Sequence, residues 1–408
     1  MPFTLPGELV ECIPVRDKAR WCEASLVKVI KPSGLRTSPI CRYFGMCGGC
    51  HYQHMAYKDQ LITKEDIFRS ILVHQVGVSG SSISPIIASK SQIGWRARAR
   101  LGLCGEDGHD NAFFGFFFAG SHELVRISTC PMLRPCLNHL LKVLHGLAGP
   151  ISRTFWDMKG LILESGIDDN ARGVIISKSV SHNARVDLLE GACTDRGICL
   201  VATNGKTMEL SFHPFKRLIF YNGPRVKEGL FSWPGSFFQA NVETNVDLVE
   251  KVVESCQQAG SRDILELYSG CGNFSIPLAL MGFRVTAVEV DTLAFEAAKI
   301  NRARNMLDPS RLRLVNADAT KYLAGLGPKM DFDTVVLDPP RQGAKRLCQL
   351  LAKSDVRALI YVSCDPMTLA RDVKILGEGG FELVESSPID MFPHTFHIES
   401  VTKLTRKQ

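Results

Sequence analysis

The chain has 408 residues, of which 45% are hydrophobic and 22% are charged, and its formal net charge is +6 at pH 7. These values are typical of a globular protein with two or three domains, and the mild positive charge is compatible with a polyanionic partner without indicating one. The chain has no apolar run near 18 residues and no charged segment before an apolar N-terminal stretch, so we expect no membrane span, no secretory signal and a cytoplasmic location. Fourteen cysteines in that compartment should be mostly reduced, which favours metal binding or catalysis over disulfides where they cluster.

The first half of the chain predicts short β segments around two helices. Residues 1–40 read as a short β-rich piece that ends at a Lys-Pro-Ser-Gly breaker. The periodicity of 57–72 predicts a helix, and from about 83 to 230 short strands with Gly, Asn and Asp turns are interrupted by a helix at 137–147. The apolar face of the first helix is expected to contain Leu61, Phe68, Ile71 and Leu72.

Three cysteines lie in a Gly-rich loop, CRYFGMCGGC at 41–50, between these elements. Together with a fourth cysteine elsewhere, Cys41, Cys47 and Cys50 suit either a tetrahedral zinc ion or a cubane iron–sulfur cluster. Spacing alone favours zinc, and the expected compartment disfavours a disulfide.

The sequence pattern changes from about residue 263. Apolar runs that end in small or acidic residues alternate with helical stretches, and this alternation predicts a parallel sheet in an α/β domain. The expected strands are 263–267, 284–289, 311–315, 333–337 and 358–362.

A ligand site is expected at the carboxyl edge of this sheet. LELYSGCGNF at 265–274 ends a strand in a turn whose two glycines permit close approach to a ligand. Glu289 ends the next strand, 19 positions after Gly270, where nucleotide-binding sheets place a carboxylate for ribose hydroxyls. With NADA at 316–319 and LDPPR at 337–341 ending further strands, the set resembles a class I S-adenosylmethionine methyltransferase rather than a dehydrogenase.

A candidate nucleophile ends the next strand. YVSCDP at 361–366 contains Cys364, and Pro366 suits the first turn of a helix whose N-terminus is expected to lower the pKa of the thiol. A thiolate suits the methylation of a pyrimidine, because C5 becomes nucleophilic once the thiolate has added to C6. A base must then remove the C5 proton so that the thiolate is eliminated.

Six segments resemble, in order, the RNA uridine-5 methyltransferases, which make 5-methyluridine in ribosomal or transfer RNA. They are FFQAN (237–241), LYSGCGNF (267–274), AVEVD (287–291), LDPPRQG (337–343), YVSCDPMTLARD (361–372) and DMFPHTFHIES (390–400). The resemblance implies that Cys364 is the nucleophile and Glu399 the base. Strand alternation would place His397 on the same face as Glu399, and histidine is the commoner general base, so His397 is the rival. The resemblance also implies an S-adenosylmethionine pocket lined by Gln239, Tyr268, Asn273, Glu289, Asp318 and Asp338. The family usually has Asp where this chain has Glu266, a change that we expect to be tolerated.

The cysteine loop also matches this family, whose iron–sulfur members carry C-x5-C-x2-C near the N-terminus and a fourth cysteine much later. HELVRISTCPML at 122–133 resembles the segment with the fourth ligand, which makes Cys130 the candidate and Cys136 its rival. The resemblance therefore implies a [4Fe–4S] cluster rather than zinc. Its implied ligands are Cys41, Cys47, Cys50 and Cys130. Four protein ligands leave no open iron, so the cluster would be structural or would help to position RNA.

RNA contacts are expected in the central part of the chain. WRARARLG at 95–102 places Arg96, Arg98 and Arg100 on one side of a strand, either as a ladder of phosphate contacts or as a solvated edge strand. The aromatic run FFGFFF at 113–118 is expected to be a buried strand. The alternative is an aromatic platform on which splayed RNA bases stack.

Three parts of the chain are expected. Residues 1–40 form a partial TRAM-like β segment, shorter than the family's five-stranded RNA-binding barrel, so either the barrel is incomplete or the chain start is not the natural one. Residues 41–230 form a β-rich central domain with the iron–sulfur loop, and 231–408 form a Rossmann-like class I methyltransferase domain.

The expected function is S-adenosylmethionine-dependent methylation of uridine C5 in RNA through a covalent cysteine–C6 adduct. The cluster favours 23S rRNA as the substrate, because family members that act on transfer RNA typically lack those cysteines. The alternatives are a tRNA uridine-5 methyltransferase and an inactive iron–sulfur RNA-binding protein. Neither a membrane nor an obligate protein partner is expected.

Overall fold

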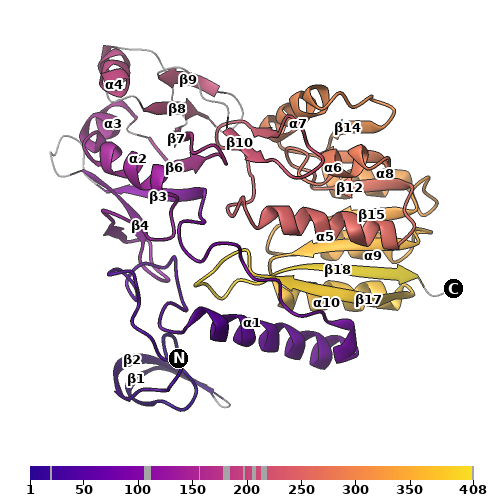
Figure 1. The fold of residues 1–408 in the computed structure, drawn as a ribbon, viewed down its shortest axis with the longest axis horizontal. Coiled ribbons are helices and arrows are strands. Elements are labelled where there is room, and N and C mark those ends of the chain that lie inside the picture. Colours follow the sequence, from indigo (N-terminus) through magenta and orange to yellow (C-terminus); the bar gives the residue numbers. More distant parts are fainter. Residues whose placement is uncertain are drawn as a thin grey trace.

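The computed structural model describes residues 1–18, 21–104, 112–155, 157–177, 184–195, 198–204, 208–212 and 218–406. Within these ranges the chain builds two seven-stranded sheets and two short two-stranded sheets. Figure 1 shows the central part of the chain, in magenta, around one large sheet and the C-terminal part, in orange and yellow, around the other. No helix in the described ranges combines the length and the apolar character needed to cross a membrane.

The C-terminal sheet has the strand order β14-β13-β12-β15-β16-β18-β17. The first five strands in this order are parallel, whereas β18 runs antiparallel between β16 and β17. The strands are β12 (Asp263–Leu267), β13 (Arg284–Glu289), β14 (Leu312–Asn316), β15 (Thr334–Leu337), β16 (Ala358–Ser363), β17 (Phe381–Ile389) and β18 (Glu399–Arg406). The five predicted strands are therefore confirmed to within one residue at each end, because apolar runs between helices report buried parallel strands reliably.

Helices cover both faces of this sheet. They are α5 (Asn245–Gln258), α6 (Ser275–Leu280), α7 (Thr292–Arg304), α8 (Ala319–Leu326), α9 (Lys345–Leu351) and α10 (Pro366–Glu378). Side chains alternate along each strand, so Ile264 packs with α5, α6 and α7 in one core, while Leu265 packs with α8, α9 and α10 in another. The two cores leave the carboxyl edge of the parallel strands free to carry polar groups.

The central sheet has the order β5-β4-β3-β6-β7-β8-β9, in which neighbouring strands are antiparallel except for the parallel pair β7 and β8. Its strands are β3 (Arg98–Cys104), β4 (Phe113–Phe117), β5 (Leu124–Arg126), β6 (Gly160–Ser165), β7 (Ala171–Ile176), β8 (Cys199–Thr203) and β9 (Met208–Phe212). The helices α2 (Pro135–His145), α3 (Ala148–Thr154) and α4 (Ala184–Asp195) accompany it, and α2 takes the place of the helix expected at 137–147. A short hairpin of β10 (Leu218–Tyr221) and β11 (Leu230–Ser232) follows before α5.

The N-terminal part consists of a hairpin, the cysteine loop and a long helix. Strands β1 (Leu9–Lys18) and β2 (Trp21–Lys31) pair only with each other, so the expected β segment is a two-stranded hairpin. The helix α1 (Tyr57–Ile71) follows the cysteine loop and continues into a π-helical turn η1 (Leu72–Val76) and a short turn η2 (Gly80–Ser82). Figure 1 shows α1 running alongside the C-terminal sheet, and Phe68 joins the core that contains α10.

The buried face of the first helix agrees in part with the one expected. Phe68 and Leu72 are buried and Ile71 packs against the same core, whereas Leu61 is only half-buried. The apolar pattern missed Gln60 and Lys64, two polar residues that are buried on this helix.

Candidate active site

Three strand ends bring Asp338, Cys364 and Glu399 to one edge of the C-terminal sheet. Cys364 follows the last residue of β16, Asp338 follows the last residue of the neighbouring β15, and Glu399 is the first residue of β18. In the antiparallel pair of β16 and β18, Ser363 lies opposite Ser400. Cys364 directly follows Ser363 and Glu399 directly precedes Ser400, so the two residues lie at the same end of this strand pair.

Burial and like charge dominate the electrostatics of this edge. Glu399 is only 3% exposed, and burial, together with the nearby Asp338 carboxylate, raises its pKa well above the ordinary value. Burial raises the pKa of Cys364 to about 12, with Glu399 and Asp338 adding to the rise and Arg341 opposing it. Burial also raises the pKa of Asp338 to about 7. An acidic edge with so little compensating positive charge is suited to a cationic ligand.

The expected lowering of the Cys364 pKa by the helix N-terminus is therefore wrong. The reason is that Asp365 caps α10, and its side chain accepts hydrogen bonds from the amides of Met367 and Thr368, each at 2.9 Å. These amides point at the Asp365 carboxylate, so they are not available to stabilise a thiolate.

The glycine-rich turn after β12 borders a small cavity of about 30 Å³ beside Asp338. Four of the six residues expected to line the cofactor pocket line this cavity: Gln239, Tyr268, Asn273 and Asp338. Tyr268 has a φ of +65°, a conformation that is costly for a bulky side chain and is typical of residues held in place at a binding site. Nothing lies within 4 Å of the position that a Cβ on Gly270 would take, so the turn is open to a ligand there.

The other two expected residues lie at neighbouring strand ends. Glu289 ends β13, and its carboxylate accepts hydrogen bonds from the amide of Gly270 at 2.8 Å and from the amide of Asp291 at 2.7 Å. Asp318 lies two residues beyond β14 and caps α8, accepting from the amide of Lys321 at 2.8 Å. The Glu289 carboxylate thus links the glycine-rich turn to the end of β13. Its oxygens can still accept a further hydrogen bond from a ligand.

Glu266 is buried beneath this turn. It is 1% exposed, and burial raises its pKa well above the ordinary value, while the nearby hydroxyl and amide of Ser275 oppose the rise. Its carboxylate oxygens make no well-aligned hydrogen bond among the described residues, so Ser275 compensates its burial only weakly.

The four cysteines that are expected to act as ligands line one cavity of about 20 Å³: Cys41, Cys47, Cys50 and Cys130. The rival Cys136 lies elsewhere, with its thiol 3.9 Å from a carboxylate oxygen of Asp169. Burial raises the pKa of Cys50 to about 12, and the neighbouring Cys130 adds to this rise. Within the described residues no three acidic, histidine or cysteine side chains are arranged closely enough to hold a metal ion as they stand. The four cysteines nevertheless line the same cavity, and thiols are the donors that a thiolate-bound centre would need.

The alternation expected at 95–102 is present, because Ala97 and Ala99 are buried and the three arginines are not, but Arg98 and Arg100 also have protein partners. Strand β3 begins at Arg98, whose guanidinium pairs with the buried Glu164 at 3.2 Å, and Arg100 donates to the carbonyl of Lys159 at 2.9 Å. Arg96 precedes the strand, lines the cysteine cavity and lies over the ring of Trp95. Alternation along a strand could not reveal these partners because they come from other segments.

His397 does not share a strand face with Glu399, because β18 begins at Glu399. Its Nε2 lies 3.2 Å from the Arg341 guanidinium, and burial together with the Arg341 charge lowers its pKa to about 4. A neutral imidazole beside an arginine is a weaker proton acceptor than a carboxylate whose pKa is raised.

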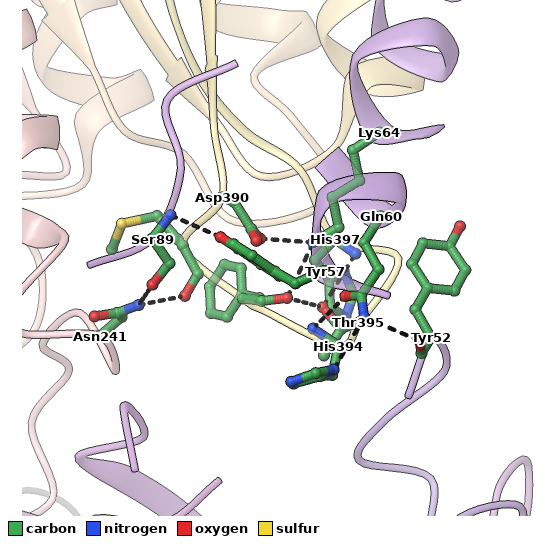
Figure 2. Close-up of polar contacts among 12 residues, drawn as sticks. Tyr52, Tyr57, Gln60, Lys64, Ser89, Asn241, Asp390, His394, Thr395 and His397 are labelled. Atoms are coloured by element: carbon green, nitrogen blue, oxygen red, sulfur yellow. Dashed lines mark hydrogen bonds and ion pairs between the residues drawn. The ribbon is translucent and has the colours of Figure 1, made fainter. Parts of the chain in front are cut away.

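Sequence reasoning missed a buried polar network next to Glu399. Figure 2 shows side chains from α1 meeting the loop at 390–398, among them Gln60, Lys64, Asp390 and His394. The four-residue spacing of Gln60 and Lys64 was the available signal, but polar residues at that spacing usually face solvent.

Comparison with known proteins agrees with the geometry of the sheet edge. The family model for tRNA (uracil-5-)-methyltransferase matches residues 231–407. Two similar proteins are described as 23S rRNA (uracil(1939)-C(5))-methyltransferase RlmD. The one from Nitrosococcus oceani is 30% identical over 99% of this chain and 90% of its own length, and the one from Halomonas elongata is 33% identical over 98% and 83%.

A solved structure is similar over the whole chain. The tRNA (uracil-54, C5)-methyltransferase of Pyrococcus abyssi, in complex with S-adenosyl-L-homocysteine, superposes with a TM-score of 0.74 and 27% identity, covering 99% of this chain and 95% of that one. The chain therefore belongs to the RNA uridine-5 methyltransferase family, and it is an RNA (uracil-C5) methyltransferase.

Proposed function

We propose that this enzyme methylates C5 of a uridine in 23S rRNA, with S-adenosylmethionine as the methyl donor. The observation that carries the proposal is the meeting of Cys364, Glu399 and Asp338 at one buried sheet edge beside the glycine-rich turn. The relatives from Nitrosococcus oceani and Halomonas elongata support ribosomal RNA as the substrate. A tRNA substrate is the second candidate, because it is the substrate of the structural relative from Pyrococcus abyssi.

In the proposed reaction, the Cys364 sulfur adds to C6 of the uracil and the electron pair of the C5–C6 bond moves toward C5 and the O4 carbonyl. The enolate carbon C5 would then take the methyl group of S-adenosylmethionine, with S-adenosyl-L-homocysteine as the leaving group. Glu399 removes the remaining C5 proton, the C5–C6 double bond re-forms, and the Cys364 sulfur leaves as a thiolate. Glu399 ends the sequence protonated and must release its proton to solvent before the next cycle.

The electrostatics support this division of roles. The raised pKa of Glu399 makes its carboxylate a stronger base than an exposed glutamate, which suits it to accept a proton from carbon. Cys364 needs a lower pKa than its own surroundings provide, because burial raises it and the charges of Glu399 and Asp338 add to the rise. A sulfonium cation next to Asp338 would relieve that repulsion, so we infer that the thiolate forms once the methyl donor is bound.

The proposed methyl-donor site combines the cavity and the two strand-end carboxylates. The amino-acid and sulfonium end would contact four residues that line the cavity at the glycine-rich turn: Gln239, Tyr268, Asn273 and Asp338. Glu289 would bind the ribose hydroxyls, and Asp318 would lie near the adenine because it follows the next strand.

We further propose that Cys41, Cys47, Cys50 and Cys130 hold a [4Fe–4S] cluster. The shared cavity and the separate position of Cys136 support this ligand set. Such a cluster would stabilise the loop between the hairpin and α1, and it takes no part in the methylation chemistry. The proposed division of the chain places this loop at the start of a central domain, 41–230, between the N-terminal segment 1–40 and the catalytic domain 231–408.

Mapping 5-methyluridine in RNA from a strain that lacks the gene tests the substrate. Loss of one 23S rRNA site, restored by the wild-type gene and not by Cys364→Ala, is the expected result. Loss of a tRNA site with intact 23S rRNA would identify the second candidate.

The step order tests Glu399. Glu399→Gln should accumulate a methylated covalent complex with RNA that contains normal uridine, because only the last proton transfer is blocked. If Glu399→Gln turns over normally while His397→Ala traps the complex, the two roles must be exchanged.

A further inference from the structure

One face of α1 is polar, fully buried and directed at the loop that ends in Glu399. Gln60 and Lys64 are four residues apart, so they share a face, and both are 0% exposed. They meet residues 390–398, the loop that joins β17 to β18 (Figure 2). The first residue after this loop is Glu399, so the conformation of the loop sets where that carboxylate lies.

Lys64 fixes the beginning of the loop. Its ammonium donates to a carboxylate oxygen of Asp390 at 2.6 Å and to the carbonyl of Phe392 at 3.0 Å, and both charged side chains are fully buried. A buried ammonium is tolerated where it is paired and hydrogen-bonded, so this geometry admits little rearrangement. On the opposite side, the Asn241 amide donates to the carbonyl of Met391 at 3.2 Å.

Gln60 fixes the middle of the loop through one residue, His394. Its amide nitrogen lies 3.0 Å from Nδ1 of His394, and its amide oxygen accepts from the backbone N–H of His394 at 3.0 Å. The same amide group donates to the carbonyls of Tyr52 and Met55, at 3.0 and 2.8 Å. His394 has a φ of +64°, a left-handed conformation that persists only where the surroundings hold it.

The segment after the last cysteine of the loop holds His394 from a third direction. The carbonyl of His394 accepts from the amide of His51 at 2.7 Å and from the amide of Tyr52 at 3.0 Å. These two residues directly follow Cys50, so the cysteine loop and the catalytic loop share backbone hydrogen bonds.

From these contacts we propose that Gln60 and Lys64 are positioning residues, which hold the loop 390–398 in the conformation that places Glu399 against Cys364. The proposal rests on the proposed function in that it takes Glu399 as the base. It gives the polar face of α1 a positioning role in catalysis, although this face lies more than three hundred residues before Glu399 in the sequence.

The chemistry of the contacts favours positioning over simple stabilisation. Apolar residues of similar volume often stabilise a buried site as well as an ion pair does, whereas directional hydrogen bonds to loop backbone groups specify one backbone conformation. Lys64 donates to the carbonyl of Phe392 and Gln60 accepts from the N–H of His394, so each of the two residues fixes one backbone group of the loop. A misplaced loop should impair the step that needs Glu399 and spare the addition of Cys364, which lies on a different strand end.

Two variants with a matched control test the proposal. Gln60→Leu removes every Gln60 hydrogen bond, and Thr395→Val is the milder change. Thr395 is 1% exposed and bridges the carbonyl of Phe392, at 2.8 Å, and the amide of His397, at 3.3 Å, inside the same loop. Lys58→Met changes an exposed residue of the same helix and serves as the control.

Each variant is mixed with unmodified substrate RNA and S-adenosylmethionine, and the methylated, denaturant-resistant enzyme–RNA complex is quantified over time beside Glu399→Gln. We expect Gln60→Leu and Thr395→Val to form the complex at near the wild-type rate and to release it at least about 10-fold more slowly, so that it accumulates. Lys58→Met should behave as wild type. Hydrogen–deuterium exchange should show faster exchange of the amides at 394–398 in both variants and unchanged exchange in β12.

Equal slowing of complex formation and release, or wild-type release in Gln60→Leu, would overturn the positioning role. If Gln60→Leu does not fold, Gln60→Glu takes its place, because it keeps the oxygen that accepts the His394 N–H and loses the side-chain donor; Thr395→Val reports only whether the loop conformation matters. Absence of the methylated complex in Glu399→Gln as well would instead contradict the proposed base, so the two failures are distinguishable.

Discussion

Removing the Glu289 carboxylate should weaken the binding of S-adenosylmethionine without altering the catalytic edge. In the structure this carboxylate accepts the amides of Gly270 and Asp291 at 2.8 and 2.7 Å, so it holds the glycine-rich turn in place before any ligand binds. Glu289→Ala would lose this support together with the proposed bonds to the ribose hydroxyls. A charge-assisted hydrogen bond contributes about 1.5–3 kcal/mol, which corresponds to a loss of about 10- to 150-fold in affinity.

Isothermal titration calorimetry with S-adenosylmethionine and with S-adenosyl-L-homocysteine measures this loss. Glu296→Ala is the matched control, because Glu296 is a half-buried glutamate on α7 that pairs only with Lys299 among the described contacts. It should bind as wild type does. An unchanged dissociation constant for Glu289→Ala, with the far-ultraviolet circular dichroism of wild type, would refute the assignment of the ribose site.

Three further predictions follow from the buried groups. Anaerobically purified protein should contain close to four irons, and Cys130→Ala should lose most of them while Cys136→Ala keeps them; stoichiometric zinc without iron would contradict the cluster. Because burial raises the folded-state pKa of Glu266, its folded form holds a proton more tightly than its unfolded form, and stability should fall as pH rises above the ordinary value of 4.5. Glu266→Gln should therefore gain thermal stability relative to wild type between pH 5 and pH 8, and a constant difference across that range would show that Glu266 does not contribute. His397→Ala should slow turnover without trapping a methylated complex, because His397 is bonded to Arg341 and its pKa is lowered to about 4.

The C-terminal sheet and the residues at its carboxyl edge could be predicted because each signal is local. Apolar runs report buried strands, and the residue that follows each run, such as Asp338 or Cys364, must lie at the common edge of a parallel sheet. The same logic predicted Glu289 at the end of β13. These inferences needed the order of elements and no knowledge of distant contacts.

The partners of charged residues could not be predicted in this way. Arg98 looked like a surface residue on an alternating strand, but its partner Glu164 lies on β6. Lys64 looked solvated on a helix, but Asp390, more than three hundred residues away, makes its burial possible. The pKa of Cys364 was predicted in the wrong direction, because burial and the charges of Glu399 and Asp338 raise it, while the first amides of the helix are taken by the Asp365 cap.

Covalent trapping tests the central claim most directly. RNA that contains 5-fluorouridine at the target position blocks removal of the C5 substituent, so a competent enzyme should remain attached to it. After digestion of the complex formed in the presence of S-adenosylmethionine, mass spectrometry should find the methylated fluorouridine on the peptide that contains Cys364, and Cys364→Ala should form no complex while binding S-adenosylmethionine as wild type does. An adduct on another residue, or one that persists in Cys364→Ala, would contradict the account.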